Sequence, residues 1–153
     1  MNLNILNTEV QDFINSNLKT DLTKLILKGS PFNAVTMQEI AEQIVAKNKC
    51  ALKLPSWFST KNIYYPNKLN IEQTSSEITA NYKANLLHGN SLIDVSGGFG
   101  VDTFYFAQKF KQVTHFEINK WLSEIVTHNF KQLQIKNIET YIGDGLLFLK
   151  DIY

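Results

Sequence analysis

The chain has 153 residues, of which 44% are hydrophobic and 19% charged, and its formal net charge is +1. The composition is that of an ordinary globular domain, and the small charge excludes a general attraction to nucleic acids or membranes, so any basic surface must be local. No apolar run approaches the ~18 residues of a transmembrane helix, and the polar start is not a secretory signal, so we expect a cytoplasmic protein with no membrane contact. A single cysteine, Cys50, excludes an internal disulfide and a cysteine-rich metal site.

Residues 1–58 form a predicted helical module. Apolar residues recur at helical spacing over residues 3–18 and again over residues 22–26. Thr36 and Glu39 match a capping box at the start of a third helix. The apolar stripe expected on that helix consists of Met37, Ile40, Ala41, Ile44 and Val45. A core from fewer than ~60 residues is marginal by itself, so we expect this module to pack on the C-terminal part of the chain.

Residues 59–90 form a predicted connector and helix. The helical patterns are interrupted at Pro55 and Pro66, which favours short extended pieces between them. Aromatic and basic side chains alternate in this region, at Trp57, Phe58, Tyr64 and Tyr65 and at Lys53, Lys61 and Lys68. Such residues either stack on single-stranded RNA and neutralise its phosphates, or pack the helical module onto the sheet. Packing is the favoured interpretation.

A second capping-box pattern precedes the alternating part of the chain. Thr74 and Glu77 predict the start of a helix, and Gly89 predicts its end. The face expected to be buried consists of Ile78, Tyr82 and Leu86.

From Ser91 onward, strand and helix patterns alternate. The predicted strands are residues 92–95, 113–117 and 138–142, and the predicted helices are residues 101–110 and 119–133. Alternation of this kind is typical of a parallel sheet with right-handed helical crossovers. The predicted fold class is therefore α/β, with a partial Rossmann-like parallel sheet over residues 91–153 after the helical module.

A glycine-rich turn follows the first predicted strand. Gly97, Gly98 and Gly100 remove side chains at the point where the strand leads into a helix, so a ligand can approach backbone N–H groups there. Ligands of doubly wound sheets bind outside the carboxyl ends of the strands. Asp94 lies at the end of the first strand, where its carboxylate favours a cationic ligand and repels a pyrophosphate.

Two further acids follow the next two strands. Glu117, 17 residues after Gly100, is placed to accept both hydroxyls of a ribose, a feature shared by nucleoside and dinucleotide sites. Thr103 stands where the dinucleotide glycine pattern requires a small residue, which argues against a dinucleotide. Asp144, between Gly143 and Gly145, either accepts a hydrogen bond from an adenine amino group or serves as ordinary turn chemistry.

With these residues in place, the sequence resembles the class I methyltransferases that use S-adenosylmethionine. Residues 94–100 resemble the first motif of that family, which holds the methionine portion of the cofactor; Glu117 matches its ribose-binding acid and Asp144 its adenine-binding acid. Residues 72–84 are similar to the pre-motif helix of RNA-modifying members, including trimethylguanosine synthases. The whole chain resembles the front portion of a bacterial group of predicted RNA methyltransferases that continue into a second half-sheet and a THUMP-like RNA-binding domain.

The resemblance implies a missing part. The family's catalytic motif follows a fourth strand, whereas this chain stops at Tyr153 after three predicted strands. The catalytic residues are therefore unknown, and little or no turnover is expected, since methyl transfer depends on positioning the acceptor. The first strand also has no fourth strand beside it, so we expect its edge to be met by a second copy of the chain or by the N-terminal segment.

More than one function remains open. The chain is either the cofactor-binding part of an RNA-directed methyltransferase or a non-catalytic adaptor that binds RNA or protein. A dehydrogenase is a third interpretation, which Asp94 and Thr103 disfavour. No metal site is expected, because His88, His115 and His128 do not share a helix at ligand spacing.

Overall fold

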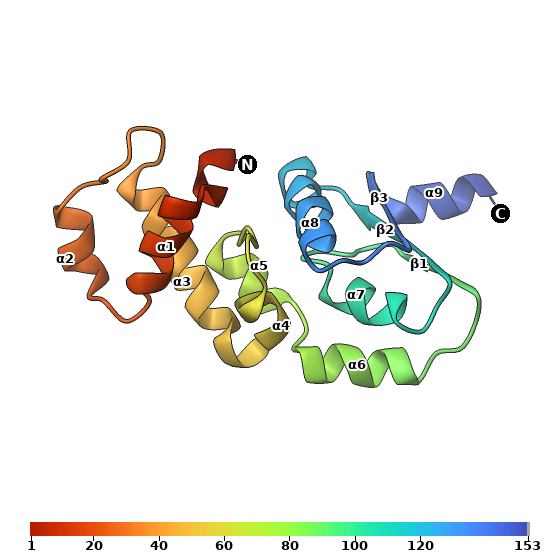
Figure 1. Ribbon diagram of the computed structural model, residues 1–153. Coiled ribbons are helices and arrows are strands. Elements are labelled where there is room, and N and C mark those ends of the chain that lie inside the picture. Colours follow the sequence, from red (N-terminus) through yellow and green to blue (C-terminus); the bar gives the residue numbers. More distant parts are fainter. Residues whose placement is uncertain (153) are drawn as a thin grey trace. The chain divides into compact units, whose positions relative to one another are not determined.

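A computed structural model describes residues 1–152, with the backbone alone at 151 and 152. The chain divides into two compact units, Met1–Glu72 and the part from Gln73 onward, each of which is described by itself (Figure 1). The division falls inside the segment 59–90, which the sequence predicts to be a connector and a helix. Within residues 1–152, no helix is both long and apolar enough to cross a membrane.

The N-terminal unit is helical, as predicted. Its elements are η1 (Leu3–Leu6), α1 (Thr8–Ser16), α2 (Leu22–Leu27), α3 (Met37–Lys53), α4 (Pro55–Ser59) and α5 (Lys68–Gln73). The predicted capping box begins α3: the Glu39 backbone N–H donates to Thr36 Oγ1 at 3.2 Å, and the Thr36 N–H donates to the Glu39 carboxylate at 2.8 Å. These two bonds satisfy N–H groups that a helix start otherwise leaves without partners.

The aromatic segment of this unit is interior. Trp57 and Tyr65 are 0% and 3% exposed, and the Tyr65 hydroxyl donates to the Trp57 carbonyl oxygen at 2.9 Å. These aromatic side chains pack inside the N-terminal unit itself, and stacking of RNA on Trp57, Tyr64 and Tyr65 is excluded because all three are buried. Their predicted role in packing the helical module onto the sheet stays a prediction. The expectation of short extended pieces is wrong at residues 55–59, where Pro55 occupies the first turn of α4 because its fixed φ suits that position.

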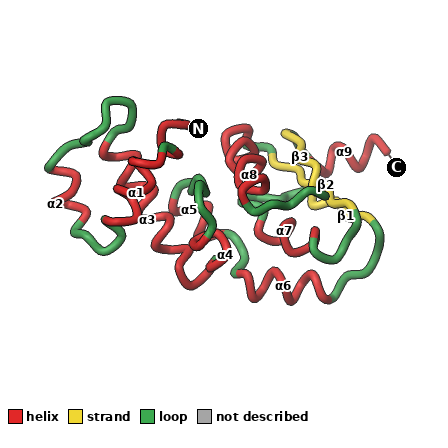
Figure 2. The backbone as a smooth tube through the Cα atoms, in the orientation of Figure 1, coloured by secondary structure: helices red, strands yellow, loops and turns green. Residues whose placement is uncertain are grey.

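The second unit has the predicted α/β fold. Its elements are α6 (Glu77–Asn85), β1 (Ser91–Asp94), α7 (Val101–Ala107), β2 (Gln112–Glu117), α8 (Lys120–Gln132), β3 (Ile138–Ile142) and α9 (Gly145–Ile152). The three strands form a parallel sheet in the order β1-β2-β3, drawn in yellow in Figure 2. Asp94 is the register partner of His115, and Glu117 is the partner of Ile142. Among the described strands, β1 pairs with β2 alone and is an edge of the sheet.

Side chains alternate between the two faces of this sheet. Val113 is fully buried against Ala107 and Phe110, on the face that carries α7 and α8. Phe116 points to the opposite face, where its ring stacks on Tyr141 at 5.3 Å between centroids and contacts Phe148 of α9 at 4.7 Å. Residues two apart in β2 share a face, so His115 and Glu117 lie on the α7 side with Val113.

Helix α6 differs from its prediction. The cap is Ser76, whose side chain accepts from the Thr79 N–H at 3.1 Å, and not Thr74. The predicted buried face is exposed, with exposed fractions of 84%, 64% and 61% at Ile78, Tyr82 and Leu86. The buried side chains are Glu77, Ala80 and Ala84. Small residues let α6 approach α7 closely, so packing on the neighbouring helix decided which face turned inward.

Candidate functional site

The predicted site residues converge at the carboxyl edge of the sheet. Asp94 ends β1 and Glu117 ends β2, and the carboxyl ends of parallel strands lie at one edge. The turn after β1 reaches β2 directly, because the Gly97 N–H donates to the Phe116 carbonyl oxygen at 2.9 Å. The start of α9 is equally close, since a Cβ on Gly145 would lie 2.6 Å from the Val95 Cα. The acids and the glycine turn therefore surround one region.

The Asp94 carboxylate is held by two hydrogen bonds. Its Oδ2 accepts from the Thr103 hydroxyl at 2.6 Å, and its Oδ1 accepts from the Ser96 backbone N–H at 3.3 Å. Thr103 belongs to the first turn of α7, so the helix that follows the glycine turn reaches back to the strand before it. The half-buried carboxylate is thus fixed in orientation at the end of β1.

A buried histidine, His115, contacts Thr103 from the interior of the protein. The Thr103 hydroxyl lies 2.9 Å from His115 Nδ1, and His115 is fully buried beneath the edge of the sheet. Desolvation lowers the pKa of His115, while the negative charges of Asp94 and Glu117 act in the opposite direction. His115 Nε2 has no hydrogen-bond partner among the described residues. Asp94, Thr103 and His115 form what we call the Asp94 network.

Sequence reasoning missed the last two members of this network. It treated Thr103 as a departure from a dinucleotide pattern and His115 as an ordinary strand residue. The sequence nevertheless held a signal for His115. In the strand that contains Val113 and Glu117, His115 is the residue between them that points to the same face as the buried Val113. A histidine that shares a strand face with a buried valine needs a hydrogen-bond partner inside the protein.

The three positions of the turn are glycines for different reasons. A Cβ on Gly97 would lie 2.0 Å from the His115 ring, and a Cβ on Gly100 would lie 2.6 Å from the Phe130 ring. Both glycines are therefore required by packing inside the protein. Gly98 has a φ of +54° and open space around it, with Ser96 O at 4.0 Å as its nearest neighbour. Gly98 is the position at which a ligand can approach bare backbone.

Glu117 is fixed by the turn that follows β2. Its Oε1 accepts from the Asn119 backbone N–H at 2.7 Å, and the Asn119 side chain in turn caps α8 by accepting from the Leu122 N–H at 3.1 Å. Glu117 is half-buried, and no described residue hydrogen-bonds its Oε2. One carboxylate oxygen thus remains able to accept from a ligand.

Asp144 is exposed and performs helix capping. Its Oδ1 accepts from the Leu146 N–H at 2.8 Å and from the Leu147 N–H at 3.4 Å, at the start of α9. The preceding residue links the two strands, because the Gly143 N–H donates to the Glu117 carbonyl oxygen at 3.1 Å. Turn chemistry at Asp144 is therefore confirmed, and its contact with an adenine stays a prediction.

The segment before β1 is fastened to the start of α7 by polar contacts. The Ser75 hydroxyl and the Lys83 ammonium both donate to Asp102 Oδ2 at 2.9 Å. The Tyr105 hydroxyl donates to the buried Glu77 carboxylate at 2.8 Å. These contacts hold α6 against the helix that carries Thr103.

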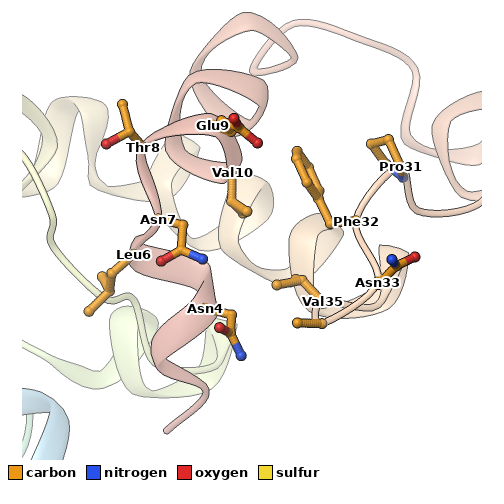
Figure 3. A pocket seen from close by; sticks show the side chains of 11 residues that line it. Asn4, Leu6, Asn7, Thr8, Glu9, Val10, Pro31, Phe32, Asn33 and Val35 are labelled. Carbon is orange, nitrogen blue, oxygen red and sulfur yellow. The ribbon is translucent and has the colours of Figure 1, made fainter.

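A large surface cavity lies elsewhere, in the N-terminal unit. It has a volume of about 770 Å³ and lies between the turn joining η1 to α1 and the loop at residues 31–35 (Figure 3). Phe32 and Val10 face it from opposite sides, with Glu9 at its rim. Its other lining residues carry apolar, hydroxyl or amide side chains, so it lacks the clustered charges found at the sheet edge.

Comparison with known proteins supports the fold. No family model matches the chain, and no curated protein matches it. The structure of a candidate methyltransferase from Porphyromonas gingivalis W83 matches with a TM-score of 0.80 and 24% identity, over 97% of this chain and 37% of that protein. The chain therefore spans little more than a third of that protein's length, and at this identity the likeness shows the fold alone.

Two other structures match more distantly. An rRNA methylase from Streptococcus thermophilus has a TM-score of 0.39 and 22% identity, over 44% of this chain and 41% of that one. A phosphoethanolamine N-methyltransferase from Haemonchus contortus, in complex with phosphoethanolamine and S-adenosylhomocysteine, has a TM-score of 0.40 and 15% identity, over 88% of this chain and 22% of that one.

Proposed function

We propose that this chain is the S-adenosylmethionine-binding part of a methyltransferase. The observation that carries the proposal is the convergence of Asp94, Glu117 and the open backbone at Gly98 on one edge of a parallel sheet. The fold shared with the Porphyromonas gingivalis protein agrees with it. Asp94, Gly97, Gly98 and Gly100 are assigned to the methionine moiety, Glu117 to the ribose and Asp144 to the adenine.

The charge of this edge selects the type of nucleoside. The Asp94 carboxylate beside the glycine turn favours a ligand that carries ammonium and sulfonium groups there, and it disfavours a pyrophosphate. Glu117 Oε2 is able to accept from a ribose hydroxyl. When bound, S-adenosylmethionine supplies an electrophilic methyl group. The protein's part is to hold the nucleoside in place against its acceptor.

RNA is the proposed methyl acceptor of the whole protein. This step rests on the similarity of residues 72–84 to the pre-motif helix of RNA-modifying methyltransferases. The interleaved aromatic residues do not contribute to it, because Trp57 and Tyr65 are interior. Because this chain spans 37% of the Porphyromonas gingivalis protein, the acceptor site and the transfer step are proposed for the whole protein. We propose that the 153 residues alone bind the cofactor without turnover.

Calorimetry with S-adenosylmethionine, S-adenosylhomocysteine and NAD tests the proposal. We expect binding of both sulfur compounds, no binding of NAD, and weakening by about tenfold or more in Asp94→Asn and Glu117→Gln, because each removes a charged hydrogen-bond partner. Glu139→Gln is the matched control, since this exposed carboxylate lies on β3 away from the carboxyl ends of the strands.

The outcomes separate the two function classes. Binding that is lost in both site variants and kept in Glu139→Gln supports the methyltransferase. If the wild-type chain binds neither sulfur compound, the proposal is contradicted and the non-catalytic adaptor is favoured. Transfer of a labelled methyl group to RNA by the whole protein, and not to bulk protein, tests the acceptor.

A further inference from the structure

The proton positions in the Asp94 network follow from its geometry. The Thr103 hydroxyl has one proton and lies within hydrogen-bond distance of both Asp94 Oδ2 and His115 Nδ1. An ionised carboxylate can only accept, so the hydroxyl donates to Asp94 and must accept from His115. His115 therefore carries its proton on Nδ1, and its Nε2 is the bare nitrogen. The buried Nε2 without a partner is consistent with this assignment, since a buried N–H without a partner would be a lost donor.

The surroundings of His115 keep this arrangement in place. The Phe130 ring packs perpendicular to the imidazole, with 5.7 Å between ring centroids, and the Gly97 backbone lies so close that an added Cβ would be 2.0 Å from the imidazole ring. The ring is fully buried, and the charged groups that face it are Asp94 and Glu117. The hydrogen bond to Thr103 is the polar contact of this buried ring, and it holds Nδ1 toward the Thr103 hydroxyl.

We propose that Thr103 and His115 are positioning residues, which fix the Asp94 carboxylate so that its Oδ1 faces the cationic group of the cofactor. This inference rests on the proposed function. Oδ2 is occupied by the short bond from Thr103, whereas Oδ1 accepts one long bond from Ser96 and keeps accepting capacity. A carboxylate held at one oxygen meets a ligand without first losing rotational freedom, and this preorganisation raises affinity.

The test compares two replacements of Thr103. Thr103→Val keeps the shape and removes the donor, and we expect S-adenosylmethionine to bind about tenfold or more weakly. Thr103→Ser restores the hydroxyl, and we expect affinity within about threefold of the wild type. Thr127→Val is the control, because the hydroxyl of the half-buried Thr127 links α8 to Thr140 of β3 at 2.8 Å and does not contact Asp94.

A spectroscopic measurement reads the network without any cofactor. In ¹⁵N spectra of histidine-labelled protein, we expect the His115 signal to show the Nδ1–H tautomer, and Thr103→Val to lose it. The signal is assigned by its disappearance in His115→Asn. A merely structural role for Thr103 would not move the tautomer.

The outcomes distinguish this inference from the function on which it rests. A wild-type chain that binds neither sulfur compound overturns the proposed function. If the wild type binds and Thr103→Val binds as well as Thr127→Val, the positioning role alone is overturned. An Nε2–H tautomer in the wild type also overturns it, whatever the affinity.

Discussion

The turns after β1 and β3 look alike in sequence and differ in what surrounds their acids. Each combines an aspartate with glycines at the end of a short strand, with Asp94 three positions before Gly97 and Asp144 between Gly143 and Gly145. Asp94 is held from beneath by a buried network, through a 2.6 Å bond to Thr103 and a 2.9 Å contact from Thr103 to His115. Asp144 is exposed and bonds only to the backbone of its own helix among the described residues. The fold therefore controls the orientation of Asp94, which a neighbouring strand and helix support, more than that of Asp144.

Substitution at the β1 turn is expected to have the largest effect. Gly97→Ala places a methyl group 2.0 Å from the fully buried His115 ring, so the ring or the turn must shift, and we expect a loss of about 2–3 kcal/mol or more in the free energy of unfolding. In Gly98→Ala the new methyl group has open space around it, and the cost comes only from the positive φ that alanine must adopt. We therefore expect a loss of about 1–2 kcal/mol in the free energy of unfolding. Urea denaturation measures both.

A double variant sharpens this first prediction. If the His115 ring causes the cost at Gly97, then Gly97→Ala should cost much less when His115 is already replaced by alanine. Equal costs of Gly97→Ala with and without the ring would contradict the assigned contact.

The pH dependence of stability is expected to show an intermediate effect. Desolvation lowers the pKa of His115 in the folded chain below its unfolded value of ~6.5. The unfolded state therefore binds more protons than the folded state below pH ~6.5. The contribution of neutral His115 to the free energy of unfolding is fully present above that pH and is lost as the pH decreases, by at most ~1.4 kcal/mol per pH unit.

Urea denaturation between about pH 5.5 and 7.5 measures this slope. His115→Asn should flatten it, since asparagine does not titrate. An unchanged slope in His115→Asn would show that another group is responsible. It would also weaken the claim that the turn after β1, unlike the turn after β3, depends on the buried His115.

The smallest effect is expected at the β3 turn. Asp144→Ala removes a helix cap and should lower the free energy of unfolding by about 0.5–1 kcal/mol, while Asp144→Asn should leave it nearly unchanged, because asparagine caps equally well. S-adenosylmethionine affinity should fall less in Asp144→Ala than in Asp94→Asn. An equal or larger loss of affinity in Asp144→Ala would contradict the conclusion that Asp94 is the acid whose orientation the fold controls.

Much of the second unit follows from its sequence. The strand at Ile138–Ile142 and the helix bounded by Asn119 and Leu133 match their predictions, because apolar periodicity and a capping asparagine mark them locally. The convergence of Asp94 and Glu117 also follows, since alternating strands and helices imply parallel strands whose carboxyl ends share an edge. The second copy of the chain expected at the edge of β1 stays a prediction.

Other features depend on which elements become neighbours. The exposed stripe of α6 was predicted to be buried because Ile78 and Tyr82 are apolar, yet Ala80 and Ala84 face α7. In the same way, Pro55 was taken as a break and instead begins α4. Periodicity shows that a helix has faces, and only its packing partner selects between them.

The α/β alternation, the glycine turn and the acids at the strand ends are predictable from the sequence, because each depends on residues close together along the chain. The tertiary structure decided how the acid at 94 is held. Its support comes from Thr103 on a helix and His115 on the next strand, 9 and 21 positions away along the chain. Hydrogen bonds between such residues exist only when folding has brought their elements to the distances observed, and the requirement for glycine at 97 arises from the same close approach.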